Sequence, residues 1–234
     1  MKIKFHHIII ALLLATTGCK KDNYDAPSVT LKGHLTYKGD NINVEANQVP
    51  FDVYQPGFGK SGSIRGFFDQ EGAYSLLLFN GNYKFTMPAN QGPFLWKELG
   101  SGKRDTLAIT VSGNQDLNIE VTPYYMLRDA KFTAAANKVT AVFNIEKVIT
   151  DVNAKNIDRV TLYLGKTQFV SENGDNRIAR TDLAGSAIGS LSNISLTVNI
   201  PGITPTQNYV FARVGLKIAG VEDMIYTPVT KVSF

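Results

Sequence analysis

The stretch GFFDQEGAYSLLLFNGNYKFTM, residues 66–87, decides the fold. Short apolar runs surround two turn signals, DQEG at 69–72 and Asn-Gly at 80–81, and apolar and polar residues alternate in the run after Asn-Gly. Alternation with a period of two is typical of a β-strand with one buried face. Asn-Gly between two such runs favours a tight hairpin turn, because both residues accept positive φ. The stretch therefore predicts antiparallel strands, with the runs on either side of Asn-Gly paired as a hairpin.

Similar short runs extend outward on both sides, from Val29 to about Pro123. They are rich in β-branched and aromatic residues, and Gly, Asn and Asp separate them. About seven strands in roughly 95 residues is the number expected of a β-sandwich. The pattern therefore predicts a first β-sandwich domain over residues 29–123.

The second half of the chain, residues 124–234, repeats this kind of pattern without repeating the sequence of the first. Its strand-like runs lie at 137–148, 157–165, 194–200, 208–220 and 224–234. Pro228 predicts an edge strand or a bulge in the last run, since proline has no N–H for a ladder. The whole chain is therefore predicted to be all-β, with a second sandwich of immunoglobulin or fibronectin type following the first.

The N-terminus has the three parts of a secretory signal, which predicts a signal peptide over residues 1–18. Lys2 and Lys4 precede an uncharged apolar run at 8–15, and small residues lead to Cys19. As a helix that run would span about 12 Å, against roughly 30 Å of bilayer hydrocarbon, so it is not a stable membrane span. A buried core helix is the alternative, but no amphipathic pattern or cap precedes the charged residues that follow.

The lone cysteine, Cys19, resembles the cleavage site of bacterial lipoproteins. In that family the cysteine thiol carries diacylglycerol, and residues 19–28 would form a polar tether. Acyl chains buried in the bilayer would hold the protein on a membrane. The charged residues after Cys19 resemble the export signal of Bacteroidetes surface lipoproteins. The resemblance implies an outer-membrane protein facing the cell exterior, with the periplasmic face as the alternative.

Composition excludes several kinds of site. The 24 basic and 20 acidic residues give a formal charge of +4 without a concentrated basic face, which argues against a nucleic-acid partner. His34 is the only histidine outside the signal, and its strand phase places it on a polar face. With Cys19 acylated, neither a histidine-rich zinc site nor a Cys-His pair can be built. We expect no disulfide, no metal site and no cofactor.

The carboxylates do not form a recognisable catalytic pair. Asp69 and Glu71 are close in sequence but belong to a tight turn, where Asp69 is expected to accept backbone hydrogen bonds. Glu172 and Asp175 could ligate calcium, but the spaced acidic series of an EF-hand loop is missing. The sequence therefore predicts a protein that is not an enzyme, with no catalytic residues.

The first domain resembles the prealbumin-like, or carboxypeptidase-regulatory-like, family. A Gly-rich first strand, GHLTYKG, is followed by VPFDVYQ and then by the stretch 66–87. The residues at matching positions are Asp69, Gly72, Tyr74, Leu76, Gly81, Tyr83 and Phe85. This resemblance implies the fold and says little about function.

Taken whole, the chain resembles two-domain Bacteroidetes surface lipoproteins of the domain-of-unknown-function 3823 type. These proteins are associated with glycan-uptake systems of the starch-utilisation kind. The resemblance implies a non-catalytic auxiliary role, either binding a polysaccharide or oligosaccharide or acting as a scaffold without a glycan ligand. The implied partners are an outer-membrane transporter and its binding lipoprotein.

Aromatic residues in loops are the candidates for sugar binding, because a flat ring packs on the apolar side of a pyranose. The only tryptophan, Trp96, lies in a Gly- and Pro-containing segment, together with the candidates Phe94, Asn90 and Gln91. The alternative is that Phe94 and Trp96 fold back to cap the sandwich or pack on the second domain.

Two further aromatic pairs are candidates for other contacts. Tyr54 and Phe58 flank a Gly-rich loop and could bind a glycan, although such loops often only turn the chain. Tyr124 and Tyr125 lie at the expected domain boundary. We expect this tyrosine pair to hold the two domains together.

Overall fold

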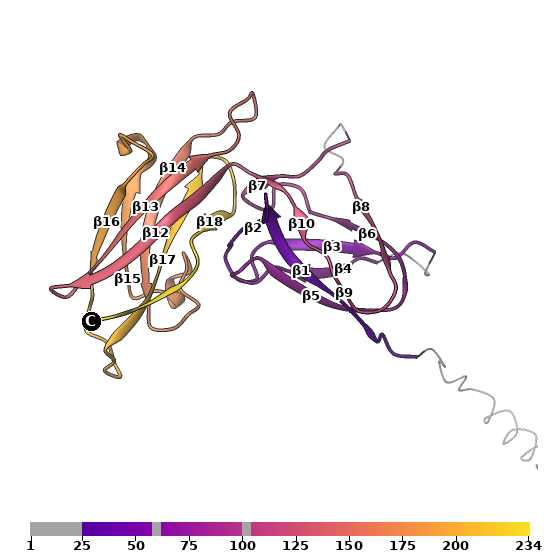
Figure 1. Cartoon of the computed structure of the whole chain (residues 1–234), viewed down its shortest axis with the longest axis horizontal. Coiled ribbons are helices and arrows are strands. Elements are labelled where there is room, and N and C mark those ends of the chain that lie inside the picture. Colours follow the sequence, from indigo (N-terminus) through magenta and orange to yellow (C-terminus); the bar gives the residue numbers. More distant parts are fainter. Residues whose placement is uncertain (1–24, 58–61, 100–103) are drawn as a thin grey trace, which may run out of the picture.

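The computed structural model describes residues 25–57, 62–99 and 104–234. Two β-sandwich domains lie side by side, which confirms the all-β prediction (Figure 1). The predicted signal peptide, the lipidation residue Cys19 and the candidate Phe58 lie outside the described residues. Within the described ranges, no helix has the length and apolar character needed to cross a bilayer.

The first domain is formed by two packed sheets and a short ribbon. In one sheet β1 pairs with β2, β5, β9 and β10, and the other sheet has the order β4-β3-β6-β8. The ribbon pairs β11 with β7 near the second domain. The strand bounds are β1 Val29–Tyr37, β2 Asp40–Asn41, β3 Pro50–Tyr54, β4 Ile64–Phe67, β5 Ala73–Leu78, β6 Gly81–Thr86, β7 Phe94–Leu95, β8 Leu107–Val111, β9 Gln115–Asp116, β10 Ile119–Glu120 and β11 Thr122–Pro123.

Aromatic rings fill the space between these two sheets. Phe51 stacks on Phe85 with ring centroids 5.0 Å apart, and it contacts Phe68 at 4.9 Å. Tyr74 packs edge-on against Phe51 at 5.4 Å. The expected turn role of Asp69 is confirmed, because its Oδ1 accepts hydrogen bonds from the backbone N–H groups of residues 71 and 73.

The predicted hairpin at Asn80-Gly81 is wrong. β5 pairs with β1, whereas β6 pairs with β3 and β8, so the chain crosses from one sheet to the other at this point. Gly81 has a positive φ of 154°. A type I′ turn would also require a positive φ at Asn80, which Asn80 does not have. The Asn80 side chain instead accepts a hydrogen bond from the backbone of Gly113, and the Tyr83 hydroxyl donates to the Phe79 carbonyl. These two hydrogen bonds fix the crossing.

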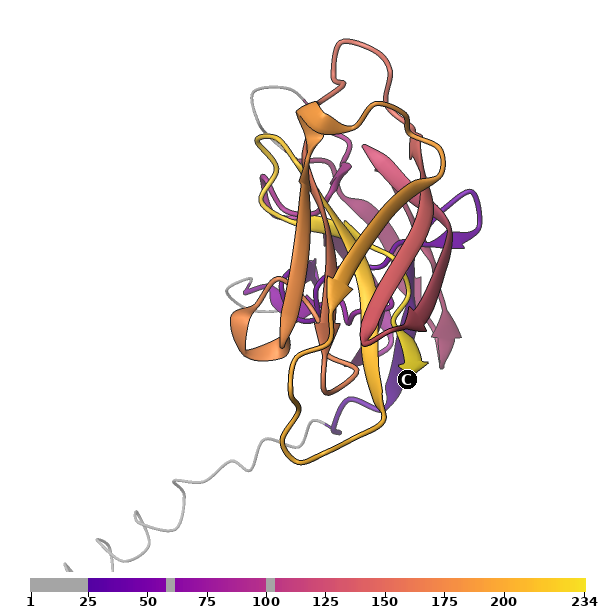
Figure 2. The same ribbon diagram turned by 90° about the vertical axis from the view of Figure 1, so that its left-hand side faces the viewer.

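The second domain is a sandwich of two antiparallel sheets (Figure 2). One has the order β12-β13-β16, and in the other β14 lies between β15 and β17, with β18 and β19 paired along β17. Pro228 lies between β18 and β19 and belongs to neither strand, where the sequence predicted an edge strand or a bulge. The bounds are β12 Tyr125–Ala135, β13 Lys138–Lys147, β14 Ile157–Gly165, η1 Gly174–Asn176, β15 Ala179–Ala184, η2 Gly185–Ala187, β16 Ile194–Asn199, β17 Tyr209–Ile218, β18 Met224–Tyr226 and β19 Thr230–Ser233.

Candidate functional site

The candidate site is an open cleft of about 580 Å³ between the two domains, called here the interdomain cleft. The first domain supplies residues 90–92 and 94–98, together with Arg104 and Thr122. The second domain supplies Asn153, Lys155, Gly220 and Val221, and Tyr124 lies between the two walls. The cleft therefore collects Asn90, Gln91, Phe94 and Trp96, the four residues that the sequence singled out first.

The loop that forms the first wall is hydrogen-bonded to the second domain. Gly92 adopts a positive φ of 84°, and its backbone N–H donates to the buried carboxylate of Asp223 at 2.6 Å. Burial raises the pKa of Asp223, and the hydrogen bond from Gly92 opposes that rise. The Gln91 amide donates to Glu222 at 3.2 Å. These contacts set the position of one wall relative to the other.

Trp96 and Phe94 occupy different environments. Trp96 is half-buried, and its indole N–H donates to the backbone carbonyl of Asp105 at 2.9 Å, so the orientation of the ring is fixed. Its centroid lies 6.1 Å from that of Phe85 in the core. Phe94 is only 3% exposed and packs in the core, as the alternative interpretation expected. Trp96 can therefore present part of a ring to a ligand, and Phe94 cannot.

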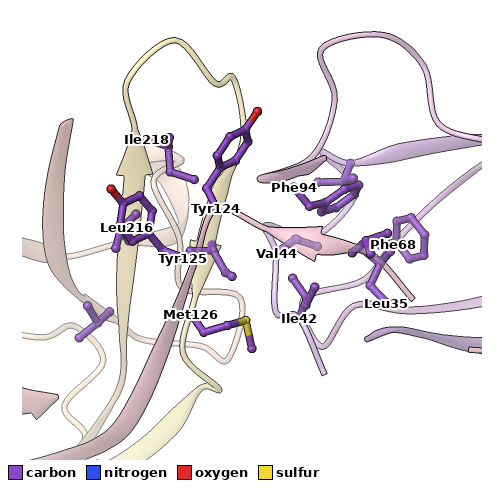
Figure 3. Packing of buried hydrophobic residues seen from close by; sticks show 14 of the residues in the cluster. Leu35, Ile42, Val44, Phe68, Phe94, Tyr124, Tyr125, Met126, Leu216 and Ile218 are labelled. Atoms are coloured by element: carbon purple, nitrogen blue, oxygen red, sulfur yellow. The ribbon is translucent and has the colours of Figure 1, made fainter. Parts of the chain in front are cut away.

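Tyr124 and Tyr125 lie where the two domains meet. Figure 3 shows Tyr124 between Ile218 of the second domain and Phe94 of the first. Its backbone N–H donates to the carbonyl of Pro93 at 3.1 Å. The Tyr125 hydroxyl donates to the backbone carbonyl of Lys155 at 2.6 Å. Both rings are buried, and together they connect the first domain to the loop that carries Lys155.

The remaining candidates lie away from the interdomain cleft. Tyr54 is half-buried at the end of β3 and does not line it. His34, on the predicted polar face of β1, is also half-buried, and its backbone N–H donates to the side chain of Asn118. The structure therefore does not join Tyr54 to the group around Trp96.

Sequence reasoning missed the residues that complete the cleft, namely Arg104, Asn153 and Lys155. Arg104 follows β7 in a polar segment, and Asn153 and Lys155 follow β13 in a turn. Neither segment has a sequence pattern that by itself indicates a binding site. Asn153 is held by its backbone N–H, which donates to Asp151 at 2.8 Å. Neither segment could be assigned to a site without knowing that the two domains meet here.

A second hollow, of about 600 Å³, lies beside the interdomain cleft, and Trp96 also lines it. This hollow is in the first domain, between the start of β8 and the segment 117–122. Tyr37 and Leu107 contribute apolar surface to it. Trp96 therefore lines two neighbouring hollows and can contribute surface to either.

The chemistry of the interdomain cleft suits a polyhydroxylated ligand. A partly exposed indole offers an apolar face, and the amides of Asn90, Gln91 and Asn153 offer donors and acceptors. Among the described residues, no group of three or more His, Cys, Asp or Glu side chains could hold a metal ion. The arrangement can bind a ligand through stacking and hydrogen bonds.

Comparison with known families shows what the chain is similar to. The N-terminal domain model of a protein family of unknown function, DUF3823, matches residues 29–122. The model of the C-terminal domain of that family, DUF3823_C, matches residues 125–231. The chain belongs to the DUF3823 family. Among curated proteins, nothing matches it.

Solved DUF3823 structures share this two-domain fold. A family member from Bacteroides ovatus is 32% identical, with a TM-score of 0.76 over 88% of this chain and 99% of its own. One from Parabacteroides merdae is 30% identical, with a TM-score of 0.76 over 89% of this chain and 100% of its own. A third structure, from Bacteroides uniformis, is described as that of a candidate carbohydrate-binding protein. It is 15% identical, with a TM-score of 0.66 over 89% of this chain and 100% of its own.

Proposed function

We propose that this DUF3823 protein is a non-catalytic glycan-binding lipoprotein, and that the interdomain cleft holds the glycan. The observation that carries the proposal is the convergence of Trp96 and three side-chain amides on one open cleft. The description of the B. uniformis structure as that of a candidate carbohydrate-binding protein is consistent with it, and at 15% identity that likeness establishes only the fold.

The glycan would lie between the domains, with the apolar face of one sugar ring on the exposed part of Trp96. The hydroxyls of neighbouring sugars would reach Asn90 on one wall and Asn153 on the other. Because the cleft is open to solvent, it could hold a polysaccharide chain without cutting it. This role needs no reactive group.

The proposal includes a lipid anchor on Cys19, placement on the outer membrane facing the exterior, and partnership with an outer-membrane transporter and its binding lipoprotein. Its support is the N-terminal sequence pattern and the resemblance described above. The geometry is compatible, because β1 begins on the side of the first domain that faces away from the second (Figure 1). A tether before β1 would leave the interdomain cleft away from the point of attachment.

A scaffold role without a glycan ligand is the second candidate. The burial of Phe94 favours it, since a single half-buried ring gives a smaller sugar platform than the expected pair. In that case the cleft would result only from the packing of the two domains and would hold no glycan. The two roles differ in one measurable property, which is whether the purified protein binds any polysaccharide.

Affinity electrophoresis against a panel of polysaccharides tests the proposal. We expect at least one polymer to retard the wild-type protein, and Trp96→Ala to abolish the retardation. Phe169→Ala is the matched control, because Phe169 is 52% exposed in the second domain and does not line the cleft. Thermal melts establish that both variants are folded. The proposal is wrong if no polymer retards the wild type, and release of reducing sugar would contradict its non-catalytic part.

A further inference from the structure

The interdomain cleft carries more positive than negative side chains on its walls. Lys97, Arg104 and Lys155 line it, and Glu98 is the one lining carboxylate among the residues that the structure describes. A neutral glycan could accept ordinary hydrogen bonds from these cations, whereas an acidic one would also gain stronger, charge-assisted hydrogen bonds. The excess of positive side chains therefore indicates which class of glycan, neutral or acidic, would bind more tightly in the cleft.

The three cations differ in how fully they are neutralised. Lys97 is paired with Asp105 at 3.1 Å. Arg104 approaches Glu98 at 3.5 Å, but its buried Nε has no hydrogen-bond partner within the described residues. Arg104 is therefore only partly satisfied by the protein itself.

Lys155 is the cation without a carboxylate partner in the part of the chain that the structure describes. Its ammonium group lies 5.8 Å from the centroid of the Tyr124 ring and beside Gly220, where a Cβ would be 3.6 Å from Nζ. Lys155 is half-buried, and a glycine at position 220 places no side chain over its ammonium group. The aromatic ring orients the lysine without neutralising it.

The acidic groups around the cleft are already engaged in other contacts. Glu222 accepts a hydrogen bond from Gln91, and Asp223 is buried and accepts from the backbone of Gly92. Asp151 accepts from the backbone of Asn153. None of these three carboxylates lines the cleft. The surplus positive charge therefore remains available to a ligand.

We propose that the glycan held in the interdomain cleft is anionic, with a carboxylate or sulfate group that pairs with Lys155 and reaches the guanidinium of Arg104. This inference rests on the proposed function and names the substrate class of the same site. The two cations lie on opposite walls, so one acidic saccharide could bridge the domains. Trp96, beside Arg104 in the first wall, would stack on the ring that carries or neighbours the acidic group.

Matched polymers test this inference with the full mature chain. Polygalacturonate is compared with the same polymer after reduction of its carboxylates, and dextran sulfate is compared with dextran. We expect one acidic member to bind about tenfold more tightly than its neutral counterpart, the ratio expected of one charge-assisted hydrogen bond. The preference should weaken as NaCl is raised. The two pairs distinguish a uronate from a sulfate.

Two variants connect the preference to the cleft. Lys155→Gln should remove most of the preference for the acidic polymer over its neutral counterpart. Lys138→Gln is the matched control, because Lys138 is exposed at the far end of the β12–β13 hairpin and should keep the preference.

The possible failures are distinguishable. If the neutral and acidic members of each pair bind equally, the anionic inference is overturned while glycan binding stands. If an acidic polymer is preferred but Lys155→Gln keeps the preference, the assignment of the charge to this cleft is wrong. If no polymer of either kind is bound, the proposed function fails, and the inference fails with it.

Discussion

The guanidinium of Arg213, in the second domain, donates a hydrogen bond to the backbone carbonyl of Val44, in the first, at 3.3 Å. Arg213 is 1% exposed, and its guanidinium carbon lies 4.0 Å from the centroid of the Tyr226 ring. Burial lowers the pKa of Arg213 to about 10, so it remains cationic at neutral pH. A buried charge at a domain boundary requires the surrounding groups to keep their positions.

Other contacts reinforce this boundary. Glu45 of the first domain accepts hydrogen bonds from Ser171 and from the hydroxyl of Tyr226, and Tyr226 forms a β-bridge with Asn43. Arg128 of the second domain pairs with Asp40 of the first. Since the two walls of the interdomain cleft belong to different domains, these contacts determine the shape of the cleft.

Arg213→Ala should lower the free energy of unfolding by about 3 kcal/mol, because it removes a buried side chain and leaves three backbone carbonyls without their donor. Urea denaturation measures the change. Arg180→Ala is the control, since Arg180 is 38% exposed and its ion pairs should contribute at most about 1 kcal/mol. Equal losses in the two variants would contradict a special role for Arg213 at the boundary.

Gly92→Ala should destabilise the cleft loop. The backbone at Gly92 has a φ of +84°, and a Cβ there would lie 2.3 Å from the buried ring of Phe94. Strain and displacement of that ring should cost about 2 kcal/mol. Thermal denaturation measures the loss. Gly189→Ala, where a Cβ would meet nothing within 4 Å, should change little, and a Gly92 variant as stable as this control would show that the loop is not held as described.

Asp223→Asn should alter how stability depends on pH. Burial raises the pKa of Asp223 above its ordinary value of 3.8, so folding disfavours the ionised form. Wild-type stability should therefore fall as the pH rises from the unfolded pKa through the folded one, and stay lower above it. The asparagine variant does not undergo this loss, and its amide oxygen can still accept from Gly92.

The measurement for this prediction is the difference in unfolding free energy, variant minus wild type, between about pH 3.5 and pH 7. That difference should become more positive with rising pH. A constant difference, or one that becomes more negative, would show that the Asp223 carboxylate is not disfavoured in the folded protein.

Cys19→Ser should abolish lipid attachment. Cells grown with labelled palmitate should yield a labelled wild-type protein and an unlabelled serine variant, because serine lacks the thiol that would carry the diacylglycerol. Detection of equal label in both variants, or in neither, would exclude the proposed anchor on Cys19.

Local patterns in the sequence predicted most of the fold. The alternation in residues 194–200 became β16, and the turn role of Asp69 was confirmed by its two backbone hydrogen bonds. Such features depend on residues that are close in sequence. The hairpin at Asn80-Gly81 failed because sheet partners far along the chain decided the path: β1 pairs with β5 and also runs parallel to β9 and β10.

The candidate site could be predicted only in part, for the same reason. Trp96, Asn90 and Gln91 were identified because aromatic and amide residues gather in one loop. Lys155 comes from the other domain, and its role depends on how that domain packs. The burial of Phe94 could not be deduced either, since an aromatic residue next to a loop can face solvent or the core with the same local pattern.

The fluorescence of Trp96, the only tryptophan in the chain, tests the central claim most directly. A polysaccharide that binds in the interdomain cleft should change the emission of this indole in a saturable way and protect it from acrylamide quenching. The midpoint of that change should equal the dissociation constant measured by calorimetry. Calorimetric binding of the same polysaccharide with no change in Trp96 emission or quenching would place the glycan elsewhere and contradict the account.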